Sequence, residues 1–482
     1  MTQTASAGGQ RPLSLPRVLT FASVAMPTSA LVLTVSVFIT PYLTGHVGLS
    51  LAAVGLIFGA VRLLDVGIDF VLGLGMDRTR TAFGRYRPWT VLGVPILMAG
   101  VYAVLMSAPG ASPFYIVGAL LLMYLGMSIL SLSHVAWAST LATSYNERSR
   151  VFGAMTAVGV LASVAVLLVP PIMAALNLDE SGADVHIVAW MIIILAPLTV
   201  GLVVFTTPEQ ITPQAPGVQF RLADYWDLVR RPSMLRVLIA DFCLTLGPGW
   251  MGTLYFFFFQ HSRGFDRAES SLLLLVYVAA GLVGAPLMGR LAMRISKHRA
   301  TILSTSIYSV TLITLMFIPQ GSMIFGAIPM FVAGFMAAGF NVLTRAMTAD
   351  IADEMRLEQG KERTGLLFAI TTLTAKLAGA LSITFTTMAL AQVGFNPRDH
   401  AVNTPAAIQG LEMVYLIGPV IFVMVGGLAF VGYKLTAERH AEIRRQLEAR
   451  DALYDEAPVI ETLTQTPSDV IPPVAPSRPT AV

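Results

Sequence analysis

Charged residues are scarce in this chain of 482 residues. Only 12% of the residues are Asp, Glu, Lys or Arg, whereas 55% are hydrophobic. A soluble domain carries roughly a quarter charged residues. A soluble chain of this length would also divide into several domains, each of which needs a polar surface. The composition therefore argues against a soluble protein and indicates a chain largely embedded in lipid.

Cysteine is almost absent as well, since Cys243 is the only one in the sequence. One cysteine excludes an intrachain disulfide and every CxxC metal or redox motif. The formal net charge of +3 gives no broad nucleic-acid-binding signature. The seven histidines are scattered and form no nucleophile–base set or metal cluster in the sequence. We therefore expect neither a membrane enzyme nor a cofactor nor a nucleic-acid partner.

Long apolar runs are what the sequence has in abundance. A helix needs about 20 mostly apolar residues to cross the hydrocarbon core of a bilayer. Runs bounded by Gly, Pro and charged residues predict an all-α membrane protein with twelve transmembrane helices. These helices are expected near 18–43, 51–76, 88–108, 113–142, 151–176, 186–206, 233–261, 267–293, 300–319, 322–350, 365–393 and 407–435.

The basic residues alternate from loop to loop in the way that twelve helices require. Most of the 31 Lys and Arg residues fall in the termini and in the loops on the same side, whereas Arg263, Arg267 and Arg398 are those of the opposite loops. Lys and Arg concentrate on the cytoplasmic side of a membrane protein. We therefore expect a multi-pass, monomeric protein of the cell membrane, such as a bacterial inner membrane, with both termini cytoplasmic.

A weak internal repeat divides the chain into two halves. A basic turn at 146–152 opens the fifth predicted helix, and a similar turn at 361–367 opens the eleventh. Chance similarity between basic turns is the alternative reading. The repeat predicts pseudo-symmetric six-helix halves over 18–206 and 233–436, with an N-terminal segment 1–17, a cytoplasmic linker 207–232 and a partly disordered tail 437–482. Transporters that rock two halves around a midplane site have this organisation.

Two acids interrupt the second apolar run. Asp65 and Asp69 are four residues apart, so their carboxylates share one helical face. A charge at the bilayer centre costs about 2.5–3.5 kcal/mol on insertion scales and usually serves a function. Two neighbouring anions favour a Na⁺ or Li⁺ ion between them, or a proton on one of them. A structural ion pair with Arg62, three residues before Asp65, is the alternative.

Lys376 lies about a dozen residues into the eleventh predicted helix, also at depth. A buried ammonium needs an anionic partner, and the acids of the second helix are candidates. If Lys376 competes with a cation for these acids, ion binding and conformation are linked, and we expect Lys376 and Arg62 to be the coupling residues. A permanent structural salt bridge between the halves is the other interpretation.

The fourth predicted helix carries His134 and Trp137 on one face. Trp stacks on sugar rings and other apolar ligand faces, while His donates, accepts or carries a proton. Together with Ser133, Ser29 and the more weakly indicated Trp250, they are our candidates for substrate contact. Packing is the common role of such residues in membrane helices and stays open as the alternative.

A charged turn follows the second helix. Asp77, Arg78, Arg85 and Arg87 lie close to Pro88, which begins the third predicted helix. Such a turn can hold helices together in one state and release them in another, so we expect a cytoplasmic gate and topology anchor. The expected counterparts in the second half are Asp350, Asp353 and Arg363.

These motifs resemble the signature of one family. The pattern Arg62-x-x-Asp65-x-x-x-Asp69-x-x-x-Gly73-x-x-x-Asp77-Arg78, followed by Gly84-Arg85-Tyr86-Arg87-Pro88-Trp89, is similar to that of the glycoside–pentoside–hexuronide:cation symporters. They are the melibiose-permease-like branch of the major facilitator superfamily. Ala349-Asp350-Ile351-Ala352-Asp353, with Gly360, Arg363, Gly365 and Lys376, resembles the matching second-half signature.

The resemblance implies the major facilitator fold and alternating access. It further implies symport of a sugar or glycoside-like solute with Na⁺, Li⁺ or H⁺, in which Asp65 and Asp69 bind the cation and Lys376 couples its binding to transport. One departure matters: melibiose-type relatives place acids in helices one and four, but 18–43 and 113–142 contain none. Galactoside recognition is therefore in doubt. A lysolipid or other amphiphile is the alternative solute, because lysolipid carriers of the wider family keep the acid pair.

Overall fold

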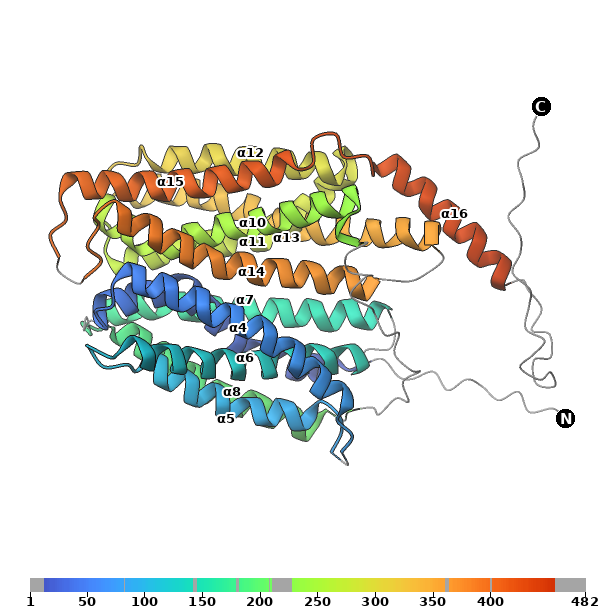
Figure 1. Ribbon diagram of the computed structural model, residues 1–482, viewed down its shortest axis with the longest axis horizontal. Helices are drawn as coiled ribbons and strands as arrows, with labels where there is room; N and C mark the ends of the chain where they lie inside the picture. Colours follow the sequence, from blue (N-terminus) through green and yellow to red (C-terminus); the bar gives the residue numbers. More distant parts are fainter. Residues whose placement is uncertain are drawn as a thin grey trace.

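The computed structural model describes residues 13–81, 83–141, 145–178, 182–207, 209, 228–359, 364–398 and 401–455. These residues form a bundle of long helices that run roughly parallel to one another (Figure 1). The first membrane span is a succession of short segments: α1 (Leu15–Ala22), α2 (Ala25–Leu33), the π-helix η1 (Thr34–Phe38), α3 (Ile39–Pro41) and the π-helix η2 (Tyr42–His46). The helices of the first half that follow are α4 (Leu51–Arg78), α5 (Arg87–Leu105), α6 (Pro113–Leu141), α7 (Tyr145–Ala175) and α8 (Ala183–Thr206).

The second half repeats this plan. Its first span combines α10 (Pro232–Phe257) with the π-helix η3 (Phe258–Ser262). The helices after it are α11 (Arg267–Ile295), α12 (Lys297–Leu315), α13 (Met323–Gln359), α14 (Thr364–Gln392) and α15 (Pro405–Leu428). A last helix, α16 (Ala437–Asp455), lies beyond the bundle (Figure 1).

Eleven of the described helical segments are long and apolar enough to cross a membrane. The one remaining predicted span, near 300–319, corresponds to α12 of the described chain. Its first turn carries Lys297, and its body is rich in Ser and Thr. Its 19 residues extend about 28 Å at 1.5 Å per residue, and it packs against α13 and α15. Its hydroxyls donate to its own backbone, as Thr301 does to the Lys297 carbonyl at 3.0 Å. The twelve-helix fold is thereby confirmed, although hydropathy alone misses α12.

The first span is irregular because its sequence weakens regular helix hydrogen bonding. Pro41 has no N–H to donate to the preceding turn. The Thr34 hydroxyl donates to the Ala30 carbonyl at 2.7 Å at the point where η1 begins. Single π-helical turns inside α-helices occur frequently at functional sites. The span predicted near 18–43 is therefore present, and it is divided into short α- and π-helical segments.

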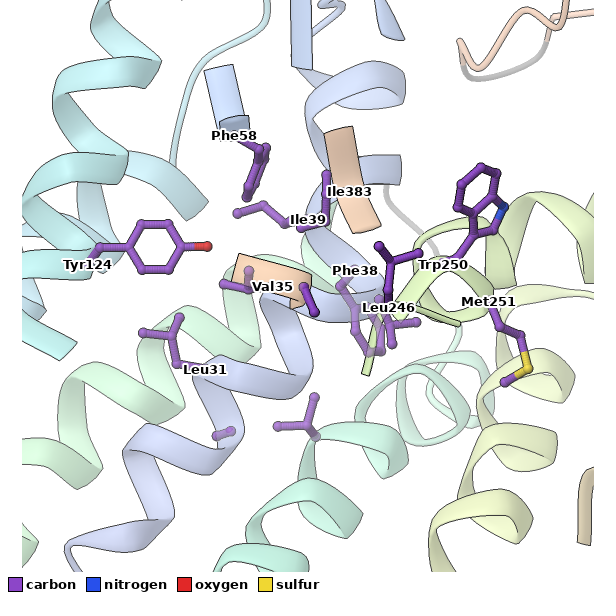
Figure 2. Packing of buried hydrophobic residues seen from close by; sticks show 14 of the residues in the cluster. Leu31, Val35, Phe38, Ile39, Phe58, Tyr124, Leu246, Trp250, Met251 and Ile383 are labelled. Carbon is purple, nitrogen blue, oxygen red and sulfur yellow. The ribbon is translucent and has the colours of Figure 1, made fainter. Parts of the chain in front are cut away.

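The two halves meet along a seam between helices. In this seam α4 packs against α14, α7 against α11, and η1 against α10. The backbone of α4 comes close to α14 at Gly55, where a β-carbon would lie 2.4 Å from the Thr387 hydroxyl. The Thr384 hydroxyl donates to the Gly55 carbonyl at 3.0 Å across the same seam. Figure 2 shows the apolar packing there, to which Phe38 of η1, Phe58 of α4 and Ile383 of α14 contribute.

The two ends of the bundle differ. We call the end at which the described chain begins and α15 leads into α16 the terminal end, and the opposite end the distal end. At the terminal end α16 lies against α13 through Ile443 and Leu447, each 1% exposed. Within the predicted tail 437–482, residues 437–455 form α16, and the remainder lies outside the described chain.

Candidate functional site

Helix α4 carries the two acids into the interior of the protein. Its first turn is capped by Ser50, whose hydroxyl accepts a hydrogen bond from the Ala53 N–H at 3.2 Å. Four turns further on, Asp65 is 1% exposed, and Asp69 follows one turn later and is partly buried. A helix places residues four apart on the same face, so the two carboxylates share the face that meets α6 and α14.

Asp65 is held by groups of its own half. Arg62 Nη1 lies 3.3 Å from Asp65 Oδ2, and the Ser128 hydroxyl of α6 donates to Asp65 Oδ1 at 3.2 Å. The Arg62 guanidinium also lies over the ring of Tyr124, 4.7 Å from its centroid. A cation over a tyrosine face is stabilised by the ring quadrupole. Arg62 is therefore fixed between an aromatic ring and a carboxylate.

Asp69 is held by the other half. Lys376 of α14 donates its ammonium to Asp69 Oδ2 and forms an ion pair across the seam. From the sequence we expected Lys376 to pair with one of the acids of α4. In the structure its partner is Asp69. Two acids thus face two cations, one from each half, and the local formal charge is balanced.

Each acid has a buried oxygen that accepts no hydrogen bond from the described residues. These oxygens are Asp65 Oδ2, which is ion-paired with Arg62, and Asp69 Oδ1. Hard carboxylate oxygens suit a small cation, and either acid can take a proton. Within the described residues no group of three or more His, Cys, Asp or Glu is arranged to hold a metal ion. A Na⁺ or Li⁺ ion would therefore combine these two carboxylates with hydroxyl, carbonyl or water oxygens.

A central cavity of about 390 Å³ is connected to the acid pair through Arg62, which lines it and pairs with Asp65. Both halves contribute to its wall, and Arg62 and Tyr124 are part of it. Its described wall is mainly apolar and contains no Asp, Glu, Asn, Gln, His or Trp. The polar groups besides Arg62 are hydroxyls from five further segments: Ser36, Tyr124, Thr245, Thr253, Tyr277 and Ser382.

The predicted substrate residues of α6 lie elsewhere. Trp137 is fully buried and packs edge-on against Phe21 at 5.5 Å between centroids. His134 Nε2 lies 2.9 Å from the Phe21 carbonyl oxygen, and Ser133 accepts a hydrogen bond from Thr90 at 3.0 Å. These contacts hold α6 against α1 and α5. In this conformation the three side chains take packing positions, and their contact with a solute stays a prediction.

Trp250 and Ser29 do not line the cavity either, as far as its described wall extends. The Trp250 indole donates to the Val414 carbonyl at 2.9 Å, and its ring fills the space beside Gly418. Its neighbours Gly249 and Met251 line the cavity instead. Figure 2 shows the Trp250 ring turned away from Tyr124. Ser29 packs against Gly159 of α7.

Truncation of Trp137 is expected to act on stability. A fully buried Trp replaced by Ala typically costs about 3–5 kcal/mol, because the transfer free energy is lost and a cavity is left. Trp137→Ala should therefore lower the midpoint of thermal unfolding, measured by circular dichroism, while ligand-induced shifts persist. A lost ligand-induced shift with unchanged stability would return Trp137 to the solute site.

The charged turn after α4 is tied to the residues that directly follow α8. Glu209, just after α8, accepts hydrogen bonds from the backbone N–H groups of Arg85, Tyr86 and Arg87 at 2.8, 2.9 and 3.2 Å. The Arg87 guanidinium donates to the Thr207 carbonyl. These bonds fix the start of α5 to the end of α8 and fit a topology anchor. Arg78 is exposed, and the Asp77 side chain lies outside the described part of the chain.

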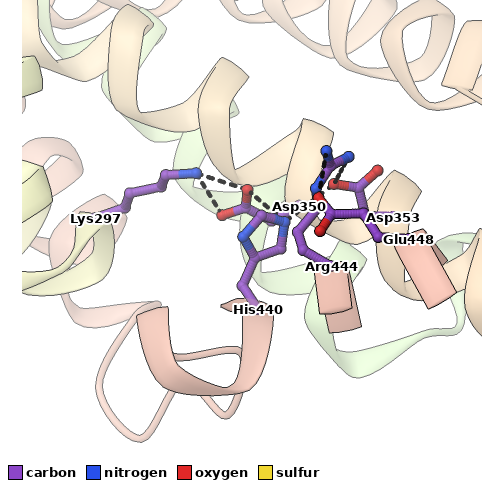
Figure 3. A network of polar contacts seen from close by, with 6 residues as sticks. All are labelled: Lys297, Asp350, Asp353, His440, Arg444 and Glu448. Atoms are coloured by element: carbon purple, nitrogen blue, oxygen red, sulfur yellow. Dashed lines mark hydrogen bonds and ion pairs between the residues drawn. The ribbon is translucent and has the colours of Figure 1, made fainter. Parts of the chain in front are cut away.

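The second-half counterparts contact α12 and α16. Lys297 Nζ lies 2.6 and 2.7 Å from the two carboxylate oxygens of Asp350. His440 of α16 lies 3.3 Å from Asp350 and 3.1 Å from Asp353 (Figure 3). Arg363 lies outside the described residues, and a gating role for these groups stays a prediction. His440 was missed because α16 gives no sequence signal of where it docks.

Further residues were missed for the same reason. Ser128 and Tyr124 are four residues apart on α6 and face Asp65 and Arg62. A hydroxyl pair at i, i+4 in an apolar helix was the available signal. Asp184 and Arg267 form an ion pair between the halves, and nothing in the sequence links two loops so far apart.

Comparison with known proteins adds the family. Residues 20–437 match the family model described as MFS/sugar transport protein. The uncharacterized symporter YnaJ of Bacillus subtilis (strain 168) is 23% identical over 460 residues, which cover 92% of this chain and 97% of YnaJ. The isoprimeverose transporter of Lactiplantibacillus pentosus is 22% identical over 437 residues, which cover 88% of this chain and 90% of that protein.

A solved structure supports the fold. The nucleoside transporter NupG superposes with a TM-score of 0.61 at 12% identity, covering 87% of this chain and all of NupG. At this identity the likeness concerns the fold alone. The family match and the symporter relatives confirm the resemblance noted in the sequence. The chain belongs to the MFS/sugar transport family, in its glycoside–pentoside–hexuronide branch, and is a secondary transporter rather than an enzyme.

Proposed function

We propose that this transporter couples a cation, Na⁺ or H⁺, to the uptake of a sugar or glycoside-like solute by alternating access. One observation supports this most directly: Arg62 belongs to the wall of the central cavity and also pairs with Asp65. A solute in the cavity and a cation at the acids therefore meet the same side chain. Li⁺ is a further candidate ion, because it has the same preference for hard oxygen ligands.

The ion step follows from charge balance. Asp65 and Asp69 are balanced by Arg62 and Lys376, so an added cation must share or displace one of these partners. Lys376 is the partner that comes from the other half. A cation that weakens the Lys376–Asp69 pair loosens a contact across the seam. Ion binding would thereby change the free-energy difference between the two states of the transporter.

The solute step follows from the cavity wall. Apolar side chains and the rings of Tyr124 and Tyr277 suit the carbon faces of a sugar ring or an apolar aglycone. Hydroxyl groups and Arg62 provide a small number of hydrogen-bonding partners. Burying a sugar hydroxyl without a partner costs about 1–3 kcal/mol on mutational scales. The scarcity of acceptors therefore favours a glycoside with an apolar group over a free hexose, and it keeps a lysolipid as the second candidate.

The membrane setting extends this proposal. The basic residues favour a terminal end that faces the cytoplasm of a bacterial cell, and a distal end that faces outward. The polar contacts that the described residues make between the halves run from mid-bundle to the distal end. We infer that the structure is closed toward the outside and that a single copy of the chain transports.

A thermal-unfolding screen tests the solute class. Purified protein is heated with methyl glucoside, with p-nitrophenyl glucoside, with p-nitrophenyl glucuronide or with lysophosphatidylcholine, each with and without Na⁺. A ligand of the native state raises the unfolding midpoint by mass action. Cation-enhanced stabilisation by a glycoside supports the proposal. Stabilisation by the lysolipid alone would favour the second candidate.

Filling the cavity should block the solute and spare the ion. Ala380 of α14 lines the cavity, so Ala380→Trp places an indole in its volume. We expect solute binding to weaken at least about tenfold, while stabilisation by Na⁺ persists. Leu373→Trp is the matched control, because Leu373 lies on the same helix and is 42% exposed. Unchanged solute affinity in Ala380→Trp would show that the solute binds elsewhere.

A further inference from the structure

An ion pair joins the two halves at the distal end. Asp184 lies in the first turn of α8, and Arg267 is the first residue of α11. Arg267 Nε lies 2.6 Å from Asp184 Oδ2, and Asp184 is 5% exposed. The pair connects surfaces that must separate when the distal end opens during alternating access.

Aromatic rings border this ion pair, of which Asp184 is the buried member. The Arg267 guanidinium lies over Phe256 of the second half at 5.0 Å and over Phe38 of the first half at 5.9 Å. These two rings contact each other at 4.9 Å between centroids. A low-dielectric setting strengthens a charge pair. It also makes a lone Asp184 carboxylate costly once its partner has moved away.

Two histidines of the first half, His46 and His186, lie near this ion pair. The Tyr42 hydroxyl lies 3.3 Å from His186 Nε2, and the His46 ring stacks on Tyr42 at 5.1 Å. The two imidazole rings are 5.6 Å apart. A cavity of about 470 Å³ between the halves is lined by His46, Asp184 and Arg267, so water and protons have access. Imidazole is the side chain that gains a charge between about pH 5 and 8.

We propose that Asp184 is a proton-linked latch of the distal end. It holds Arg267 while this end is closed, and it pairs with the protonated imidazoles of His186 and His46 when the halves separate. Acid therefore favours the open distal end, because it supplies the charge that replaces Arg267. The other titratable and charged groups around the latch are Tyr42 and Tyr115 from the first half, and His261, Asp266, Glu269 and Arg398 from the second.

Asp266 does not take over the role of Asp184. Its carboxylate accepts the Glu269 N–H at 2.6 Å, and the Glu269 carboxylate accepts the Asp266 N–H at 3.1 Å, which closes a capping box on α11. Both acids move with Arg267 when the halves separate. The latch depends on alternating access but on neither the identity of the solute nor the cation at Asp65 and Asp69.

Cysteine labelling tests the latch. Thr387 is fully buried in the seam opposite Gly55, so Thr387→Cys in a Cys243→Ala background reacts with a polar maleimide only when the distal end opens. In purified protein, Asp184→Asn should raise the labelling rate about tenfold at neutral pH. In the protein with native Asp184, the rate should rise severalfold from about pH 8 to about pH 5.5, corrected for the intrinsic thiolate reactivity with a free-thiol standard.

Matched variants decide the outcome. Arg263 and Glu412 form an ion pair at the same end, at 3.1 Å, within the second half alone, so Glu412→Gln should leave labelling unchanged. The double variant His46→Gln with His186→Gln should remove the acid-induced rise. Asp184→Asn labelling at the native rate, or an acid-induced rise that survives in the double variant, would overturn the proposal. The same labelling pattern is expected in an Asp69→Asn background, because the latch does not depend on the cation site. A failure of the proposed cation coupling would therefore leave the labelling result unchanged, and the two failures can be distinguished.

Discussion

Asp69→Asn is expected to abolish cation-stimulated solute uptake while the protein remains folded. Replacing the carboxylate removes a charged oxygen ligand, and an interaction with a charged group contributes about 1.5–3 kcal/mol. Cation affinity should therefore fall up to about 100-fold, since every 1.4 kcal/mol is a factor of ten. Asn keeps an oxygen that accepts from the Lys376 ammonium, so a hydrogen bond across the seam remains in place of the ion pair. The measurement is uptake into proteoliposomes as a function of Na⁺ concentration and of pH.

A second variant tests whether the loss of any acidic side chain, rather than of Asp69 in particular, changes the cation dependence. Asp353→Asn removes a carboxylate from α13 at the terminal end, where His440 and Arg444 surround it (Figure 3). Its cation dependence should equal that of the unchanged protein. If Asp69→Asn keeps the same half-saturating cation concentration, the acid pair is not the cation site, and the structural pairing of the acids with Arg62 and Lys376 is the better account.

Lys376→Gln is expected to separate cation binding from transport. The ammonium at Asp69 is the group with which a cation competes, so its removal should lower the half-saturating Na⁺ concentration about tenfold. Transport should nevertheless fall sharply, because ion binding no longer changes a contact across the seam. The measurement pairs Na⁺-dependent thermal unfolding with solute uptake. In Lys376→Gln with Asp69→Asn, the stabilisation by Na⁺ should be lost as well.

A different result for Lys376→Gln would contradict competition between Lys376 and the cation. Removing one partner of a buried ion pair typically costs about 3–5 kcal/mol. If Lys376→Gln loses that stability in both the presence and the absence of Na⁺, and its Na⁺ affinity does not change, the Lys376–Asp69 pair is a permanent structural bridge. This is the second interpretation that the sequence allowed.

The helical architecture could be predicted from the sequence because the lipid bilayer restricts which structures can span it. Every backbone polar group must be satisfied inside the bilayer, so apolar runs of sufficient length become helices. Charge within such a run is costly enough to reveal Asp65, Asp69 and Lys376 without any structure. The Ser- and Thr-rich α12 was also predicted, as a run over 300–319 that begins after charged residues, and the alternation of basic loops supported it. Its hydropathy is nevertheless lower than that of the eleven apolar spans.

The solute side was much harder to predict. Trp137 and His134 carry versatile chemistry, but their orientation depends on how α6 rotates against α1, which no local pattern encodes. The cavity wall is instead made of residues such as Met127, Thr245 and Val278, which look like ordinary lipid-span residues in the sequence. Contacts across the seam, such as Asp184 with Arg267, depend on how the two halves dock. That docking follows from tertiary packing rather than from periodicity.

One measurement addresses coupling itself. The solute identified by the unfolding screen is presented to proteoliposomes at equal concentration inside and outside, and an inward gradient of Na⁺ or of protons is then imposed. Coupled symport predicts that the internal solute rises above the external concentration with one of the two gradients, and that Asp69→Asn abolishes this rise. Solute that stays at equal concentration on both sides, whichever gradient is imposed, would contradict cation-coupled transport by this protein.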